Sequence, residues 1–136
     1  MTEYETPRGP VSGWAIGGAF FAAALLVITG IFQALQGLAA IIDDDFFVVS
    51  DGYAYDIDVS AWGWIHLVIG IVVALTGAYL LTGSPIAGGI AIVIAAIAAI
   101  SNFFFVPYYP LWSLVNIGLA VWVIWSLTRP GVLRRE

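Results

Sequence analysis

Residues 62–81 read WGWIHLVIGIVVALTGAYLL and contain no Asp, Glu, Lys or Arg. An α-helix of about 20 apolar residues crosses the hydrocarbon core of a bilayer, which is about 30 Å thick. The next residues are Thr82, Gly83, Ser84 and Pro85. Glycine suits the position after a helix, serine the N-cap, and proline the first helical position. This stretch therefore predicts a transmembrane helix followed by a tight turn into another helix.

Charged residues are confined to a few places along the chain. The chain has 136 residues, of which 62% are hydrophobic and 10% are charged, and none of residues 9–42 or 59–128 is charged. The mean hydropathy is +1.01. In soluble domains about a quarter of the residues are charged, so this composition indicates a membrane protein. All the basic residues lie at the two ends: Arg8, Arg129, Arg134 and Arg135.

The charge-free stretches have room for four membrane-spanning helices. We expect them at about 13–42, 62–82, 85–106 and 111–128, within a single membrane domain covering residues 1–136. The predicted fold class is an all-α integral membrane protein, an up-down-up-down bundle of four transmembrane helices. Basic residues collect on cytoplasmic flanks, so we expect both termini in the cytoplasm, residues 43–61 outside the cell, and a bacterial plasma membrane as the location.

The predicted outer loop, residues 43–61, contains six of the nine acidic residues. Asp51-Gly52 lies between β-prone runs, which is a β-hairpin signal. The carboxylate oxygens of this loop are the type of ligand that calcium prefers. The spacing of the aspartates, however, differs from that of the twelve-residue calcium-binding loop. A run of acids is ordinarily solvated, and with no cysteine and one histidine the sequence requires no cofactor. The weak candidates for a metal ion are Asp43, Asp44, Asp45, Asp56 and Asp58.

Small residues mark the helix faces that contact other helices in a membrane. Gly63, Gly70 and Gly77 repeat every seven residues, so they share one face of the second predicted helix. The first helix has a matching face, and the third has another. These two faces contain Gly30, Ala34 and Gly37, and Gly88, Ala91, Ala95 and Ala98. Gly18, Ala22 and Gly118 lie off these faces, and we expect them to contact a helix of another protein.

Uncharged polar side chains lie on these faces in the outer half of the predicted bundle. Counted at about 1.5 Å per residue from the outer helix ends, most lie roughly 6–13 Å deep. One interpretation is that they join the helices by hydrogen bonds. The other is a polar pocket beneath the acidic loop that binds a small ligand. The candidate ligand-binding residues are Gln33, Gln36, His66, Asn102, Ser113 and Asn116.

No pattern of catalytic residues is present. The predicted bundle contains no paired carboxylates, no spacing of nucleophile and base, and no phosphate-binding loop. We therefore expect a non-enzymatic interaction or accessory subunit of a homo-oligomer or a larger membrane complex. The alternative is a protein that binds a lipid, a quinone or another small ligand in the outer pocket. The expected partners of this protein are the lipid bilayer and other membrane protein subunits or its own copies. Nucleic acid is not an expected partner.

Four motifs resemble those of a known family. They are Gly13-Trp14, the segment WGWIHL at residues 62–67, and NFFFVPYYPLWS at residues 102–113, together with an acidic aromatic loop that begins DDDFF at residue 43. This combination is similar to a group of small actinobacterial four-span membrane proteins known as a domain of unknown function. The resemblance implies a plasma-membrane location and no particular activity. A more general likeness in layout to DoxX-type membrane proteins implies no site residues.

Overall fold

The computed structural model describes residues 9–42 and 59–133. This part of the chain is all-helical and contains α1 (Gly13–Ile42), α2 (Val59–Leu81), α3 (Pro85–Phe105) and α4 (Pro110–Thr128). Each of these helices is long and apolar enough to cross a membrane. The predicted fold class of four transmembrane helices is thus confirmed. The β-hairpin signal at Asp51-Gly52 lies outside the described residues.

The turn between α2 and α3 forms as its four residues predict. Gly83 has a φ of 77°, in the left-handed region that glycine adopts without strain. Ser84 is the N-cap of α3, where its side-chain oxygen accepts a hydrogen bond from the backbone N–H of Ala87 at 3.4 Å. Pro85 is the first residue of the helix. The short turn leads from the end of α2 directly into α3.

Helices α1 and α2 pack closely through their glycines. A Cβ atom built on Gly70 would lie 2.7 Å from the carbonyl oxygen of Gly30, and one built on Gly63 would lie 2.8 Å from that of Gly37. Gly77 faces the backbone of α1 in the same way, at 2.7 Å from the carbonyl oxygen of Ala23. The two backbones are therefore in direct contact, and the prediction that these glycines face another helix is confirmed.

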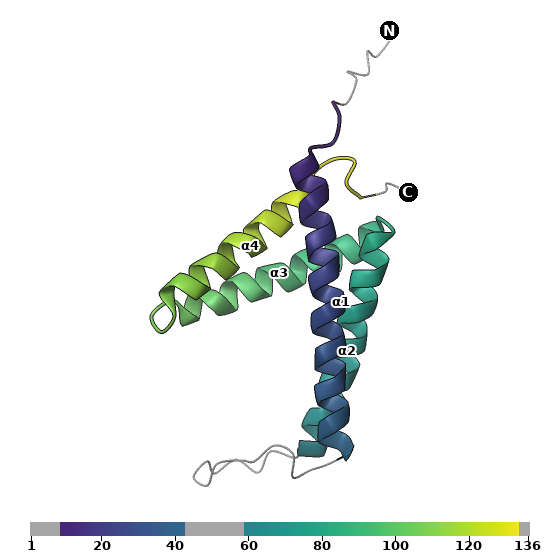
Figure 1. Cartoon of the computed structure of the whole chain (residues 1–136), viewed down its shortest axis with the longest axis vertical. Coiled ribbons are helices and arrows are strands. Elements are labelled where there is room, and N and C mark those ends of the chain that lie inside the picture. Colours follow the sequence, from purple (N-terminus) through teal and green to yellow (C-terminus); the bar gives the residue numbers. More distant parts are fainter. Residues whose placement is uncertain (1–8, 43–58, 134–136) are drawn as a thin grey trace.

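The two helical hairpins join at one end and diverge toward the other. In Figure 1, α3 and α4 run obliquely away from the α1–α2 pair, and the described ends of the chain lie where the hairpins meet. The buried core lies at that junction and takes side chains from all four helices. Its members are Ala22, Ala23, Leu26, Leu80, Ala87, Ala91, Val123 and Leu127.

Helices α1 and α4 meet in this junction at Gly18 and Ser126. A Cβ atom on Gly18 would collide with the Ser126 side chain. Ser126 is 0% exposed, and its hydroxyl donates a hydrogen bond to the carbonyl oxygen of Trp122 at 2.8 Å. Ala22 is also buried in the core. The expectation that Gly18 contacts another protein is therefore wrong, because α4 of the same chain covers it.

Segments near the two termini complete the junction. A Cβ atom on Gly131 would lie 2.7 Å from Cγ2 of Val11, and a Cβ atom on Gly88 would collide with the Leu133 side chain. Leu133 thus packs against the first turns of α3, and residues near the two termini lie at the same end of the molecule. This agrees with an even number of membrane crossings.

Candidate functional site: an apolar groove between the hairpins

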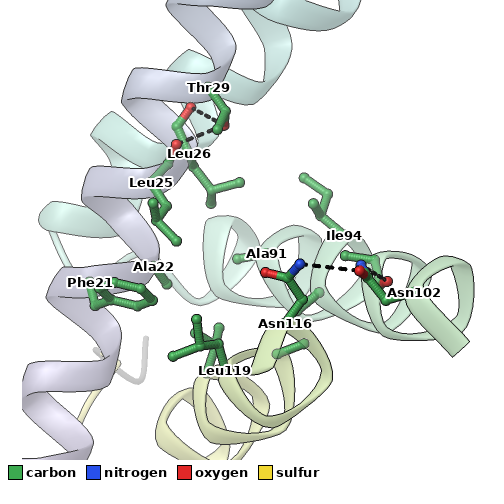
Figure 2. A pocket seen from close by; sticks show the side chains of 14 residues that line it. Phe21, Ala22, Leu25, Leu26, Thr29, Ala91, Ile94, Asn102, Asn116 and Leu119 are labelled. Atoms are coloured by element: carbon green, nitrogen blue, oxygen red, sulfur yellow. Dashed lines mark hydrogen bonds between the residues drawn. The ribbon is translucent and has the colours of Figure 1, made fainter. Parts of the chain in front are cut away.

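A groove lies between α1 and the α3–α4 hairpin, on the side where the hairpins diverge. Its volume is about 330 Å³, and Figure 2 shows it enclosed by side chains from these three helices. Most of the lining is apolar. The lining residues are Phe21, Ala22, Leu25, Leu26, Thr29, Ala91, Ile94, Ala95, Ala98, Asn102, Asn116, Leu119, Ala120 and Val123.

Two asparagines provide most of the polar lining. Nδ2 of Asn116 on α4 donates a hydrogen bond to Oδ1 of Asn102 on α3 at 3.2 Å, as Figure 2 shows. Nδ2 of Asn102 in turn donates to the carbonyl oxygen of Ala98 at 2.8 Å. A side-chain amide has two N–H donors, and these bonds use one from each residue. The pair can therefore offer a molecule in the groove the second N–H donor of each amide and the Oδ1 acceptor of Asn116.

Thr29 is the remaining polar residue of the lining, and its side chain bonds within α1. The hydroxyl donates to the carbonyl oxygen of Leu25 at 2.7 Å. A hydroxyl that bonds four residues back along its own helix needs no partner across the groove. Thr29 thus contributes little polarity, and the groove is polar only near the asparagine pair.

The six candidate residues from the sequence do not all lie together. Asn102 and Asn116 line the groove, whereas the other four are not among its lining residues. Ser113 precedes Asn116 by one helical turn and is 1% exposed. Gln33 and Gln36 lie on α1, and His66 lies on α2. The ligand-binding role assigned to the six stays a prediction, and the structure joins only the two asparagines by a hydrogen bond.

His66 contacts its own helix. Its ring stacks on the Trp62 ring, with a distance of 3.6 Å between centroids and an angle of 30° between planes. Nδ1 lies 3.1 Å from the carbonyl oxygen of Trp62. Because a carbonyl oxygen only accepts, Nδ1 carries the proton and donates in this bond.

The sequence profile of the DUF7144 family, a domain of unknown function, matches residues 18–132. The chain belongs to this family. The match covers all of the groove and both hairpins except the first residues of α1. The predicted resemblance to an uncharacterised four-span family is therefore confirmed. No curated protein and no solved structure matches the chain.

Most of the groove in this DUF7144 chain escaped prediction because its lining is apolar. In a sequence, polar residues within membrane helices mark a candidate site. Apolar lining residues such as Phe21, Leu25 and Leu119 cannot be distinguished there from residues that face lipid. One signal was present. The stripe of Ala91, Ala95 and Ala98, which ends at Asn102, marks the face of α3 that lines the groove.

The metal candidates Asp43, Asp44, Asp45, Asp56 and Asp58 lie outside the described residues. Within residues 9–42 and 59–133, no group of three or more His, Cys, Asp or Glu side chains is arranged to hold a metal ion.

Proposed function

We propose that this protein is a non-enzymatic interaction subunit of a membrane complex, and that its groove receives a transmembrane helix of another subunit. The observation that carries this proposal is the small-residue lining of the groove. Ala91, Ala95 and Ala98 follow one another along the groove face of α3, and Ala120 lies opposite on α4.

The α1–α2 contact supports this proposal from within the same chain. Membrane helices gain no hydrophobic driving force by associating, so they rely on small residues that permit close approach. This chain uses that device in α1 and α2, where Gly30 and Gly70 bring two backbones together. The alanine stripe of α3 has the same character. Ala91 packs in the buried core, whereas Ala95 and Ala98 continue the stripe along the groove.

The asparagine pair supports a helix as the occupant. Side-chain amides form hydrogen bonds between membrane helices, at about 0.6 kcal/mol each on average. The second N–H of Asn102 or Asn116 can donate to a carbonyl or a polar side chain of the incoming helix. Among the lining residues there is no carboxylate, histidine or cysteine, and this composition supports a binding role.

The test compares two tryptophan substitutions on neighbouring residues of α3. Ala98 lines the groove, whereas Ile97 is 59% exposed and is not part of its lining. The full-length protein is extracted in mild detergent, and native mass spectrometry then gives the mass of the complex. We expect the wild type and Ile97→Trp to keep a second subunit, and Ala98→Trp to lose it. A wild-type monomer without a partner, or an unchanged complex with Ala98→Trp, contradicts the proposal.

A second candidate occupant is the apolar chain of a lipid or quinone. The groove volume of about 330 Å³ lies at the lower end of the range of small-molecule pockets, and the asparagine pair supplies polar groups for a headgroup. A monomer that carries one co-purified lipid or quinone, displaced by Ala98→Trp but not by Ile97→Trp, would favour this function over the first.

We further propose that the protein lies in the bacterial plasma membrane with both termini in the cytoplasm. The proposal is supported by the shared end of Val11 and Gly131 and by the arginines near both ends of the chain. Since the chain has no cysteine, single substitutions can be labelled selectively. A membrane-impermeant maleimide on intact cells should label Ser50→Cys and not Thr2→Cys, and the opposite result would reverse the orientation.

A further inference from the structure

A second pocket lies at the joined end of the hairpins, between the start of α1 and the end of α4. It has a volume of about 440 Å³ and is lined by Trp14 from the start of α1 and by Trp122 and Trp125 from the end of α4. Trp14 is more than a hundred residues from the other two in the sequence, and the Gly18–Ser126 contact brings their helices together. The pocket is open to the surroundings, since Trp14 is 75% exposed.

The rings in this pocket have fixed neighbours. Trp14 and Trp122 meet edge to face, with a distance of 6.3 Å between ring centroids and an angle of 71°. Phe21 contacts Trp122 from the α1 side at 5.5 Å between ring centroids. Trp122 is therefore held between two aromatic rings of α1. Tryptophan prefers the level of the lipid headgroups, which places this pocket where a phospholipid headgroup joins its acyl chains.

A cation lies at the edge of the pocket. The guanidinium carbon of Arg129 is 4.4 Å from the centroid of the Trp125 ring. Within residues 9–42 and 59–133, Arg129 is the only residue with a formal charge, so these residues contain no carboxylate to neutralise it. A guanidinium stacked on an aromatic ring keeps its N–H groups in its own plane, where they can donate to phosphate oxygens.

We propose that this tryptophan pocket binds an anionic phospholipid, with the headgroup phosphate on Arg129 and the upper part of the acyl chains against Trp14, Trp122 and Trp125. The positive charge of Arg129 favours an anionic headgroup over one whose ammonium group binds the tryptophans. An aromatic pocket also suits an ammonium group, but the face of Trp125 already holds the Arg129 guanidinium. A second cation would be repelled there, whereas a net negative headgroup is attracted. This inference is independent of what occupies the groove.

The test is a native mass spectrometry titration of the detergent-purified full chain. Phosphatidylglycerol and phosphatidylcholine with identical acyl chains are added in separate experiments, and the retained lipid is counted. The wild type should retain phosphatidylglycerol about fivefold more strongly, the ratio that one basic residue near an anionic lipid contributes. Arg129→Gln should bring this ratio close to one. Equal retention of both lipids by the wild type overturns the proposal.

A matched control separates the pocket from general electrostatic attraction. Arg134→Gln removes the same charge from a residue only five positions further along the chain, and it should leave most of the preference. If Arg134→Gln reduces the ratio as much as Arg129→Gln does, the pocket proposal is wrong.

Tryptophan variants provide a test that keeps every charge. Trp125→Leu removes the ring beneath Arg129 and should lower the ratio, while Trp112→Leu, at the start of α4, should not. This pair also decides the question if Arg129→Gln does not fold. An unchanged ratio with Trp125→Leu contradicts the proposal.

Discussion

Asn116 donates a hydrogen bond through Nδ2 to Oδ1 of Asn102, 3.2 Å away on the neighbouring helix of the same hairpin. Both residues are half-buried. This bond joins α3 and α4 near the end where the hairpin stands apart from the α1–α2 pair (Figure 1). The bond therefore fixes the side chains of Asn102 on α3 and Asn116 on α4 relative to each other.

The first prediction concerns this pair. Asn116→Leu should lower the free energy of unfolding by about 0.6 kcal/mol, the average for such a bond between membrane helices. After Asn102→Leu the bond no longer exists, so adding Asn116→Leu should cost less than it does in the wild type. Unfolding in mixed micelles measures all four variants of the cycle. Strictly additive costs would show that the bond contributes nothing.

The second prediction concerns the backbone contact between α1 and α2. Gly70→Ala places a Cβ atom 2.7 Å from the carbonyl oxygen of Gly30, and backbone cannot rotate away as a side chain does. We expect destabilisation of about 1–3 kcal/mol, as for other over-packed sites. Gly118→Ala is the matched control, because nothing lies within 4 Å of its Cβ position. Equal stability of the two variants would argue against the close approach of the helices.

The same substitution at Gly88 should have a smaller effect. Its Cβ atom would meet the end of the Leu133 side chain, which is flexible and lies near the end of the chain. We therefore expect Gly88→Ala to cost less than Gly70→Ala in the same unfolding measurement, with a helix-propensity gain of up to about 1 kcal/mol offsetting the displacement of Leu133. A cost as large as that of Gly70→Ala would mean that Leu133 cannot move.

The third prediction concerns the turn between α2 and α3. Gly83 has a φ of 77°, a conformation that costs an L-residue about 1–2 kcal/mol. Gly83→Ala should therefore lower the free energy of unfolding by about that amount. Gly89→Ala lies in the first turns of α3 with nothing within 4 Å of its Cβ position, so it should be neutral or stabilising. A neutral Gly83→Ala would show that the turn relaxes to another conformation.

Local structure was predictable where individual residues have strong conformational preferences. Gly83, Ser84 and Pro85 each have a conformational preference that specifies the turn. The glycine face of α2 was likewise predictable, because in a membrane only small residues permit the contact that Gly70 makes with Gly30.

The angle between the hairpins was not predictable from the sequence. Each helix is apolar around nearly its whole circumference, so hydrophobic periodicity does not reveal which side faces protein and which faces lipid. The polar residues were expected near one level of an up-down-up-down bundle. Because the hairpins diverge, Asn102 and Asn116 line the groove while His66 bonds within α2.

The placement of the core at one end of the molecule has a mechanical consequence. Helices α3 and α4 are about 30 Å long at 1.5 Å per residue, and they are anchored where Leu133 packs on Gly88 and Ser126 on Gly18. The α3–α4 hairpin is thus held at one end by these contacts. A tilt of about 5° there displaces the far tip by roughly 2.5 Å over that length. A small change in the angle between the hairpins would therefore change the width of the groove at its far end.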